Sequence, residues 1–141
     1  MPIDRNALAA LIDRVERGET GRELDADVWL ACAPGRTRVK WSYVHTATGK
    51  LCEVDETRQR QQDGTNRLIV VPCYTTSIDA QAALPGDICE IHGYLSDKNE
   101  WTTWRARVLS IAGVPVWGVG PTECAARLAT KLRAIMEAQD E

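Results

Sequence analysis

The sequence contains no phenylalanine, and five tryptophans and three tyrosines supply its aromatic bulk. It also lacks a large excess of charge of one sign, since 17 basic and 20 acidic residues leave a formal net charge of −3. This balance disfavours a protein that attracts nucleic acid or an anionic membrane through a global basic field. No apolar run approaches the roughly 20 residues of a transmembrane helix, so no membrane partner is expected.

A secretion signal and a regular cysteine framework are also missing. The first residues are polar, and no long apolar stretch follows them as it does in a signal peptide. The five cysteines are odd in number and widely spaced, at positions 32, 52, 73, 89 and 124. We therefore expect a reducing compartment in which all five thiols are free.

The motifs of common enzyme classes are missing as well, including a glycine-rich phosphate loop and a nucleophile elbow. Cys89 and His92 form a C-x-x-H pair, but residues three apart in a strand point to opposite faces, which disfavours a shared metal ion. Cys73 precedes a helix start, where a thiol pKa can fall, yet no histidine lies near it in the sequence. No catalytic residue, metal or cofactor is therefore assigned.

Apolar residues recur at helical spacing in three segments, 4–17, 22–32 and about 121–138. Glu23 and Asp27 share one face of the second helix, which we interpret as a solvated acidic face and not as a metal site. A fourth, short helix is predicted to open at Thr76, with Asp79 in its first turn as in a capping box, and to close at Pro85-Gly86.

Alternation with a period of two predicts a first pair of antiparallel strands. Val39, Trp41 and Tyr43 alternate with polar residues, as in a half-buried strand, and a turn at 46–49 leads into a partner strand. The segment 55–67 is almost wholly polar and offers no apolar anchor. We interpret it as a mobile loop, because nothing in it offsets the entropy of ordering the chain.

Residues 87–111 form the clearest hairpin of the sequence. The side chains predicted to face a helix layer are Cys89, Ile91, Trp104, Ala106 and Val108. The outward face is predicted to carry Glu90, His92, Tyr94, Thr103, Arg105 and Arg107, with Glu90 opposite Arg105 or Arg107. If no helix covers this face, it is the candidate binding surface, and its candidate binding residues are His92, Tyr94, Arg105 and Arg107.

The order of the predicted elements gives the fold class. Helices at both ends and in the middle, with antiparallel strand pairs between them, are typical of an α+β protein. We expect a single layered domain over residues 1–141, in which helices pack on an antiparallel sheet.

Three segments also resemble a known family. They are RELDADVWL at 22–30, YTTSIDA at 74–80 and PTECAARLA at 121–129. Their order and spacing resemble the phage ABA sandwich domain, a small family of proteobacterial phages and prophages. The resemblance covers nearly the whole chain apart from 55–67, and it departs from the family pattern at Gln81 and at the start of the last helix. It implies an alpha-beta-alpha sandwich and no known activity.

The functional expectation follows from the resemblance and from the missing enzyme motifs. We expect a phage or prophage accessory protein of unknown function, not an enzyme, that acts through protein contacts in the cytoplasm of a bacterial host cell or in association with the virion. Its partner would be a phage component or a second copy of the chain. Two alternatives remain. Arg36, Arg38 and Lys40 precede Trp41, which would suit a nucleic-acid-binding module, and a small enzyme could carry an unrecognised site.

Overall fold

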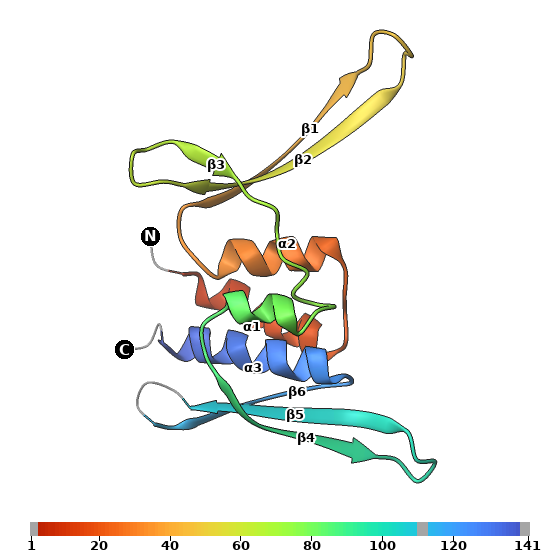
Figure 1. Cartoon of the computed structure of the whole chain (residues 1–141), viewed down its shortest axis with the longest axis vertical. Coiled ribbons are helices and arrows are strands. Elements are labelled where there is room, and N and C mark those ends of the chain that lie inside the picture. Colours follow the sequence, from red (N-terminus) through yellow and green to blue (C-terminus); the bar gives the residue numbers. More distant parts are fainter. Residues whose placement is uncertain (1–2, 110–112, 139–141) are drawn as a thin grey trace.

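A layer of helices lies between two antiparallel sheets in the computed structural model, which describes residues 3–109 and 113–138 (Figure 1). The helices are α1 (Arg5–Glu16), α2 (Arg22–Ala31) and α3 (Glu123–Ala138). The first sheet has the order β1 (Arg36–Val44), β2 (Leu51–Arg60), β3 (Asn66–Leu68). The second has the order β4 (Ile88–Leu95), β5 (Trp101–Leu109), β6 (Pro115–Gly120), and a short 3-10 helix, η1 (Asp79–Ala83), precedes it.

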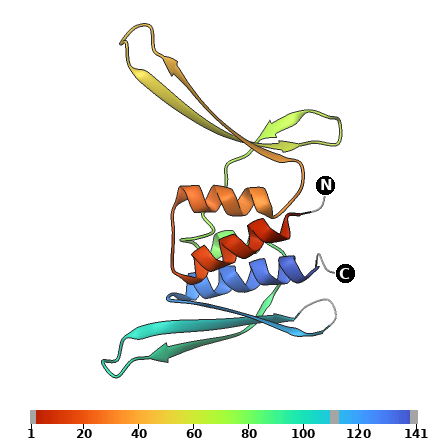
Figure 2. The same ribbon diagram turned by 180° about the vertical axis from the view of Figure 1, so that it is seen from behind.

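The α+β class is confirmed, and so is the packing of helices on an antiparallel sheet. The order of the layers differs from an alpha-beta-alpha sandwich, because the helices occupy the middle and the two sheets lie outside (Figures 1 and 2). The reason lies in the helices, whose apolar stripes pack against one another. Leu8 of α1, Val28 of α2 and Leu128 of α3 are all fully buried in the same core cluster.

The three long helices lie close to where their periodicity predicted them. Asp4 caps α1, since its carboxylate accepts hydrogen bonds from the backbone N–H groups of Asn6 and Ala7 at 2.9 and 3.2 Å. None of the helices in the described parts of the chain is long and apolar enough to cross a membrane.

The second sheet lies against α3 and supplies a smaller apolar layer. Ala106 and Val108 of β5 and Val116 of β6 are buried beneath the helix. Position 118 of β6 is a glycine, and Thr130 of α3 fills the space that a Cβ atom would need there. Because this face of the sheet packs closely against α3, the opposite face of the sheet points outward.

The polar segment 55–67 is not a single loop, so this prediction is wrong for most of its residues. Residues up to Arg60 continue β2, residues 66–68 form β3, and only the connection between them is a turn. Polar side chains replace the missing apolar anchors; Thr57, for example, donates a hydrogen bond through Oγ1 to the carbonyl of Ile69 at 2.6 Å. The mobility of the turn at 61–65 stays a prediction.

Two local predictions also need correction. The short helix begins at Asp79 and not at Thr76, and its N-cap residue, Ile78, makes no side-chain capping hydrogen bond. Just before it, Ser77 Oγ accepts a hydrogen bond from the Ala80 N–H at 3.2 Å. In β4 the register shifts between Ile88 and Glu90, so Cys89 is exposed at a bulge and Ile88 faces Val108 in its place. Residues 110 and 111 of the predicted hairpin lie outside the described residues.

Candidate functional site

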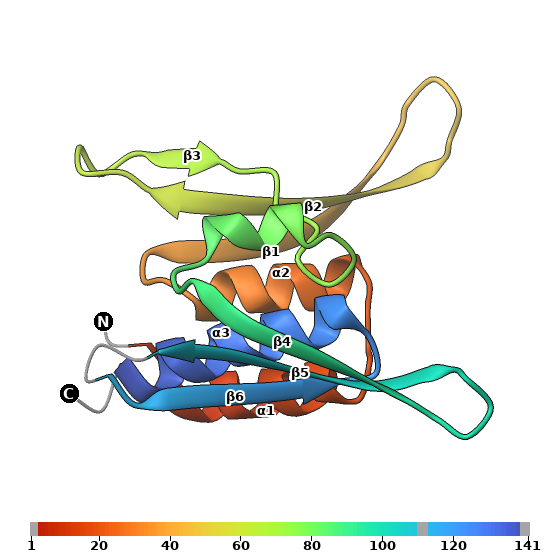
Figure 3. The same cartoon turned by 60° about the horizontal axis from the view of Figure 1, so that its bottom comes forward.

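The predicted binding surface is the outer face of the second sheet, and no helix among the described residues covers it (Figure 3). Glu90 lies opposite Arg107 and His92 lies opposite Arg105 in the register of β4 and β5. Glu90 binds both of its neighbours, with one carboxylate oxygen 2.9 Å from Arg107 Nε and the other 2.6 Å from His92 Nε2. The outward set and the predicted pairing of Glu90 with an arginine are therefore confirmed.

The sequence reasoning missed Trp117, which lies on this face on the edge strand β6. Arg105 places its guanidinium carbon 4.1 Å from the centre of the tryptophan ring, Arg107 lies at 5.7 Å, and the His92 ring stacks at 6.3 Å. The alternation of Val116 and Trp117 in the apolar segment after the hairpin is the signal that could have found it. We call Glu90, His92, Arg105, Arg107 and Trp117 the Trp117 cluster.

The groups of the Trp117 cluster bind one another. Arg107 and His92 lower the pKa of Glu90, the hydrogen bond from His92 being the larger cause. Arg105 covers the tryptophan ring, so the ring has no free face there for a stacked base. Tyr94 lies opposite Thr103, at the next outward position toward the hairpin turn, and is half exposed.

A second surface, which the sequence reasoning did not assign as a site, lies on the first sheet. The hairpin of β1 and β2, here called the ribbon, extends well beyond the helix layer (Figures 1 and 2). Val39, Trp41 and Tyr43 point to one side of it and are 46%, 47% and 43% exposed. The two aromatic rings lie 5.6 Å apart. These three residues, with Val54 and Cys52 opposite Trp41 and Tyr43 on β2, form what we call the outer ribbon face.

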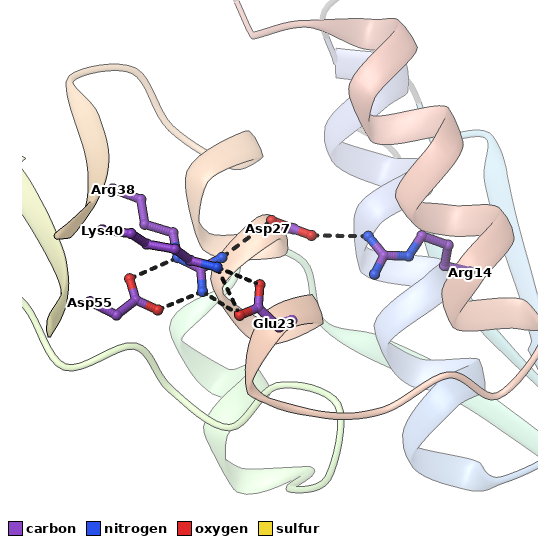
Figure 4. Close-up of polar contacts among 6 residues, drawn as sticks. All are labelled: Arg14, Glu23, Asp27, Arg38, Lys40 and Asp55. Atoms are coloured by element: carbon purple, nitrogen blue, oxygen red, sulfur yellow. Dashed lines mark hydrogen bonds and ion pairs between the residues drawn. The ribbon is translucent and has the colours of Figure 1, made fainter. Parts of the chain in front are cut away.

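The opposite side of the ribbon faces α2 and is charged (Figure 4). Arg38 is only 12% exposed and donates two hydrogen bonds to Asp55 of β2, from Nε at 2.9 Å and from Nη2 at 2.6 Å. Its guanidinium also reaches two carboxylates of α2, Glu23 at 3.0 Å and Asp27 at 3.7 Å. Lys40 adds a contact to Glu23 at 3.0 Å.

This network of ion pairs links α1, α2 and the ribbon. Asp27 also accepts a hydrogen bond from Arg14 of α1 at 3.0 Å, so the chain of ion pairs runs from α1 through α2 to the ribbon (Figure 4). Arg38 lowers the pKa values of Asp55 and Glu23 through its hydrogen bonds, and the two carboxylates raise the pKa of Arg38. Glu23 and Asp27, interpreted from the sequence as a solvated acidic face, therefore bind the ribbon.

The arrangement determines which ribbon face is available. Arg38 and Lys40 of β1 are turned toward α2 and bind Glu23, while the odd-numbered residues of β1 point to the other side of the strand. Near its base the ribbon is tied to the helices by Arg36, which donates a hydrogen bond to the Trp29 carbonyl at 2.6 Å. The ion pairs thus present the aromatic side chains to the outside.

The described residues contain no group of three or more His, Cys, Asp and Glu side chains that could hold a metal ion. All five cysteines are free. Burial raises the pKa of the Cys32 thiol to about 12 and also raises the pKa of Cys124. Cys73 is exposed, and its sulfur accepts a hydrogen bond from Arg22 Nη1 at 3.2 Å.

One buried cation lies between η1 and α3. Lys131 is 8% exposed, and its Nζ donates hydrogen bonds to the carbonyls of Gln81 at 2.8 Å and Leu84 at 3.5 Å. Burial lowers its pKa. The ammonium satisfies carbonyls at the end of η1, which is a structural role.

Comparisons of the chain with protein-family models, with curated proteins and with solved structures give no match.

Proposed function

We propose that this chain is a phage or prophage accessory protein that is not an enzyme and acts through protein–protein contacts, with the outer ribbon face as its contact surface. The observation that carries the proposal is the exposure of Trp41 and Tyr43 side by side on a projecting hairpin. Tryptophan and tyrosine are the residue types that most often dominate the energy of protein interfaces. The phage assignment rests on the resemblance of the three sequence segments.

The setting of the outer ribbon face supports the same role. Contiguous apolar side chains on a surface mark interaction sites more often than solitary ones do. Here Val39 and Val54 lie beside the two rings on the same side of the ribbon. A partner that covers this surface would bury apolar area without displacing any ion pair of Arg38.

Such a protein would act in the compartment in which its partner is found. For an accessory protein of a phage, this is the cytoplasm of the bacterial host cell or the assembled virion. The partner would be a phage component or a second copy of the chain. No cofactor enters the proposal, because contact through a preformed face needs none.

Capture experiments with matched tyrosine variants test the proposal. Tyr43 and Tyr94 are almost equally exposed, at 43% and 44%, but they lie on different sheets. We expect Tyr43→Ser and Trp41→Ser to weaken partner capture at least about tenfold, as truncation of an interface anchor does, while Tyr94→Ser leaves it unchanged. Equal retention by all three variants would contradict the proposal.

The Trp117 cluster is a second candidate surface, because it brings a tryptophan and two arginines together on an uncovered sheet face. Arginine side chains on such a face can bind the phosphates of a nucleic acid. Filter binding at several salt concentrations separates the two functions. Steeply salt-dependent retention of an oligonucleotide that is lost in Arg105→Ala would favour this alternative.

A further inference from the structure

The outer edge of β1 is free to accept another strand. The sheet order is β1, β2, β3, so among the described residues no strand lies beside this edge. The register of β1 with β2 runs from Arg36 to Val44 without a shift, and β1 contains no proline. A regular nine-residue edge of this kind lacks the bulges and prolines that usually prevent strand addition.

The hydrogen bonds at the two ends of the pair show which backbone groups point to that edge. The Arg60 N–H donates to the Gly35 carbonyl, and the His45 N–H donates to the Lys50 carbonyl, both at 2.8 Å. Since alternate residues of an antiparallel strand bond the same neighbour, the odd-numbered residues of β1 bond β2. The even-numbered residues, Lys40 and Ser42 among them, therefore direct their N–H and C=O groups to the free edge.

The charges of β1 decide between the ways in which two copies could pair. Pairing centred on Lys40 would place this residue opposite itself, and like charges directly opposite are destabilising. Pairing centred on Trp41 instead places Lys40 opposite Ser42 of the second copy and Arg38 opposite Val44. No two cations then face each other, and Trp41 meets Trp41 in a close pair without hydrogen bonds.

We infer that two copies of the chain associate through antiparallel pairing of their β1 edges, with the two-fold axis at Trp41. The inference rests on the proposed function and names its partner. The two outer ribbon faces become one continuous face of a sheet that runs from β3 of one copy to β3 of the other. Val39 of each copy then packs beside Tyr43 of the other, and aromatic and β-branched residues are favourable cross-strand partners.

The size of the contact indicates how strong the association is. Each copy contributes one nine-residue strand and the side chains beside it. An interface of this kind is smaller than those of obligate dimers, so we expect a dimer that dissociates on dilution. Light scattering after size exclusion, at a series of protein concentrations, should show a mass that rises from one chain toward two.

A proline scan of the two free edges tests the edge pairing. Ser42→Pro removes an N–H that points outward and leaves the bonds between β1 and β2 in place. Because the dimer is symmetric, the substitution removes two intermolecular hydrogen bonds. We therefore expect the dissociation constant of the dimer to rise at least about tenfold. The matched control is Asn66→Pro, which lies on the opposite edge of the same sheet, on β3. A dimer equally weakened by both variants, or by neither, would overturn the inference.

Cross-linking tests the register and does not depend on the proline variant folding. The background carries Cys52→Ser, Cys73→Ser and Cys89→Ser. In the register centred on Trp41, Val39 lies opposite Tyr43 of the second copy at about 4.5 Å between Cα atoms, within disulfide range. An equimolar mixture of Val39→Cys and Tyr43→Cys chains should therefore form a linked dimer on mild oxidation, and each chain alone should not.

The possible outcomes separate this inference from the proposed function. A chain that is monomeric at all concentrations and forms no linked dimer overturns the self-association. If Trp41→Ser and Tyr43→Ser still impair capture of another protein in that case, the outer ribbon face keeps its role and its partner is foreign. If the chain dimerises while Ser42→Pro has no effect, the dimer uses another surface and the inference is wrong.

Discussion

Arg38 holds Asp55 with two parallel hydrogen bonds, at 2.9 and 2.6 Å, on the side of the ribbon that faces the helices. The same guanidinium reaches Glu23 of α2, so one side chain joins the two strands to the helix layer. A planar guanidinium can donate two parallel hydrogen bonds to one carboxylate and a further one to another, whereas an ammonium group has no such fixed fork of donors. The position of the aromatic face therefore depends on a residue on the opposite face.

Replacement of Arg38 tests this dependence. We expect Arg38→Met to lower the free energy of unfolding more than Lys40→Met does, because Arg38 is only 12% exposed and its hydrogen bonds join β1, β2 and α2. Lys40→Met removes a more exposed cation and should cost less than about 1 kcal/mol. Urea unfolding of both variants measures the difference. Equal losses would show that Arg38 acts as an ordinary surface charge.

The same carboxylates predict how stability depends on pH. Asp55 and Glu23 have folded-state pKa values below their ordinary 3.8 and 4.5, mainly because Arg38 donates hydrogen bonds to them. A lowered pKa stabilises the fold above the ordinary value, and this contribution is lost as the pH falls through the lowered one. Melting temperatures between pH 7 and pH 3 should therefore fall less steeply for Asp55→Asn than for the unchanged chain. Parallel profiles would contradict the assignment.

The uncovered face of the second sheet predicts small effects on stability. Arg105 and Arg107 contact Trp117 and Glu90 at the surface, and such exposed contacts stabilise a fold only weakly. We expect the double variant Arg105→Ala, Arg107→Ala to melt within a few degrees of the unchanged chain. A loss of stability much larger than this in thermal unfolding would mean that another element packs over the arginine stems.

The contact between β6 and α3 predicts a large effect from a single methyl group. The Cβ atom added by Gly118→Ala would overlap the backbone of Thr130, which is fully buried. We expect a loss of about 1–3 kcal/mol in chemical unfolding, as for other overpacked core positions. Val119→Ala, at the next and more exposed position, serves as the control and should cost less than half as much. Equal tolerance would show that the strand can move away from the helix.

The parts of the fold that follow a strong apolar period were predictable. The stripe of Leu128, Leu132 and Ile135 predicts α3, and the alternation around Ala106 predicts the outer face that carries Glu90 and Arg107. Both patterns arise because only one side of the helix or strand is buried, and this one-sided burial is visible in the spacing of apolar residues along the sequence.

The parts that depend on polar contacts between distant segments were not predictable. Residues 55–60 extend β2 through partners such as Arg38, 17 residues before Asp55, and no apolar period records such a pairing. The sequence did not predict the order of the layers. The apolar stripe of a helix indicates that one side of the helix is buried, but not whether a sheet or another helix covers that side. The outer ribbon face was missed for a related reason. Val39, Trp41 and Tyr43 indicate a half-buried strand, and only the structure places their side away from α2.

A photoreactive phenylalanine analogue at position 41 tests the central claim most directly, since it reports what touches the outer ribbon face. Position 101 is the control, because Trp101 is also an exposed tryptophan, at 56%, but lies on the second sheet. After illumination of cells that produce the chain, we expect a discrete protein adduct, a second copy or another protein, from position 41 and none from position 101. The absence of an adduct at position 41, or the same adducts from both positions, would contradict the account.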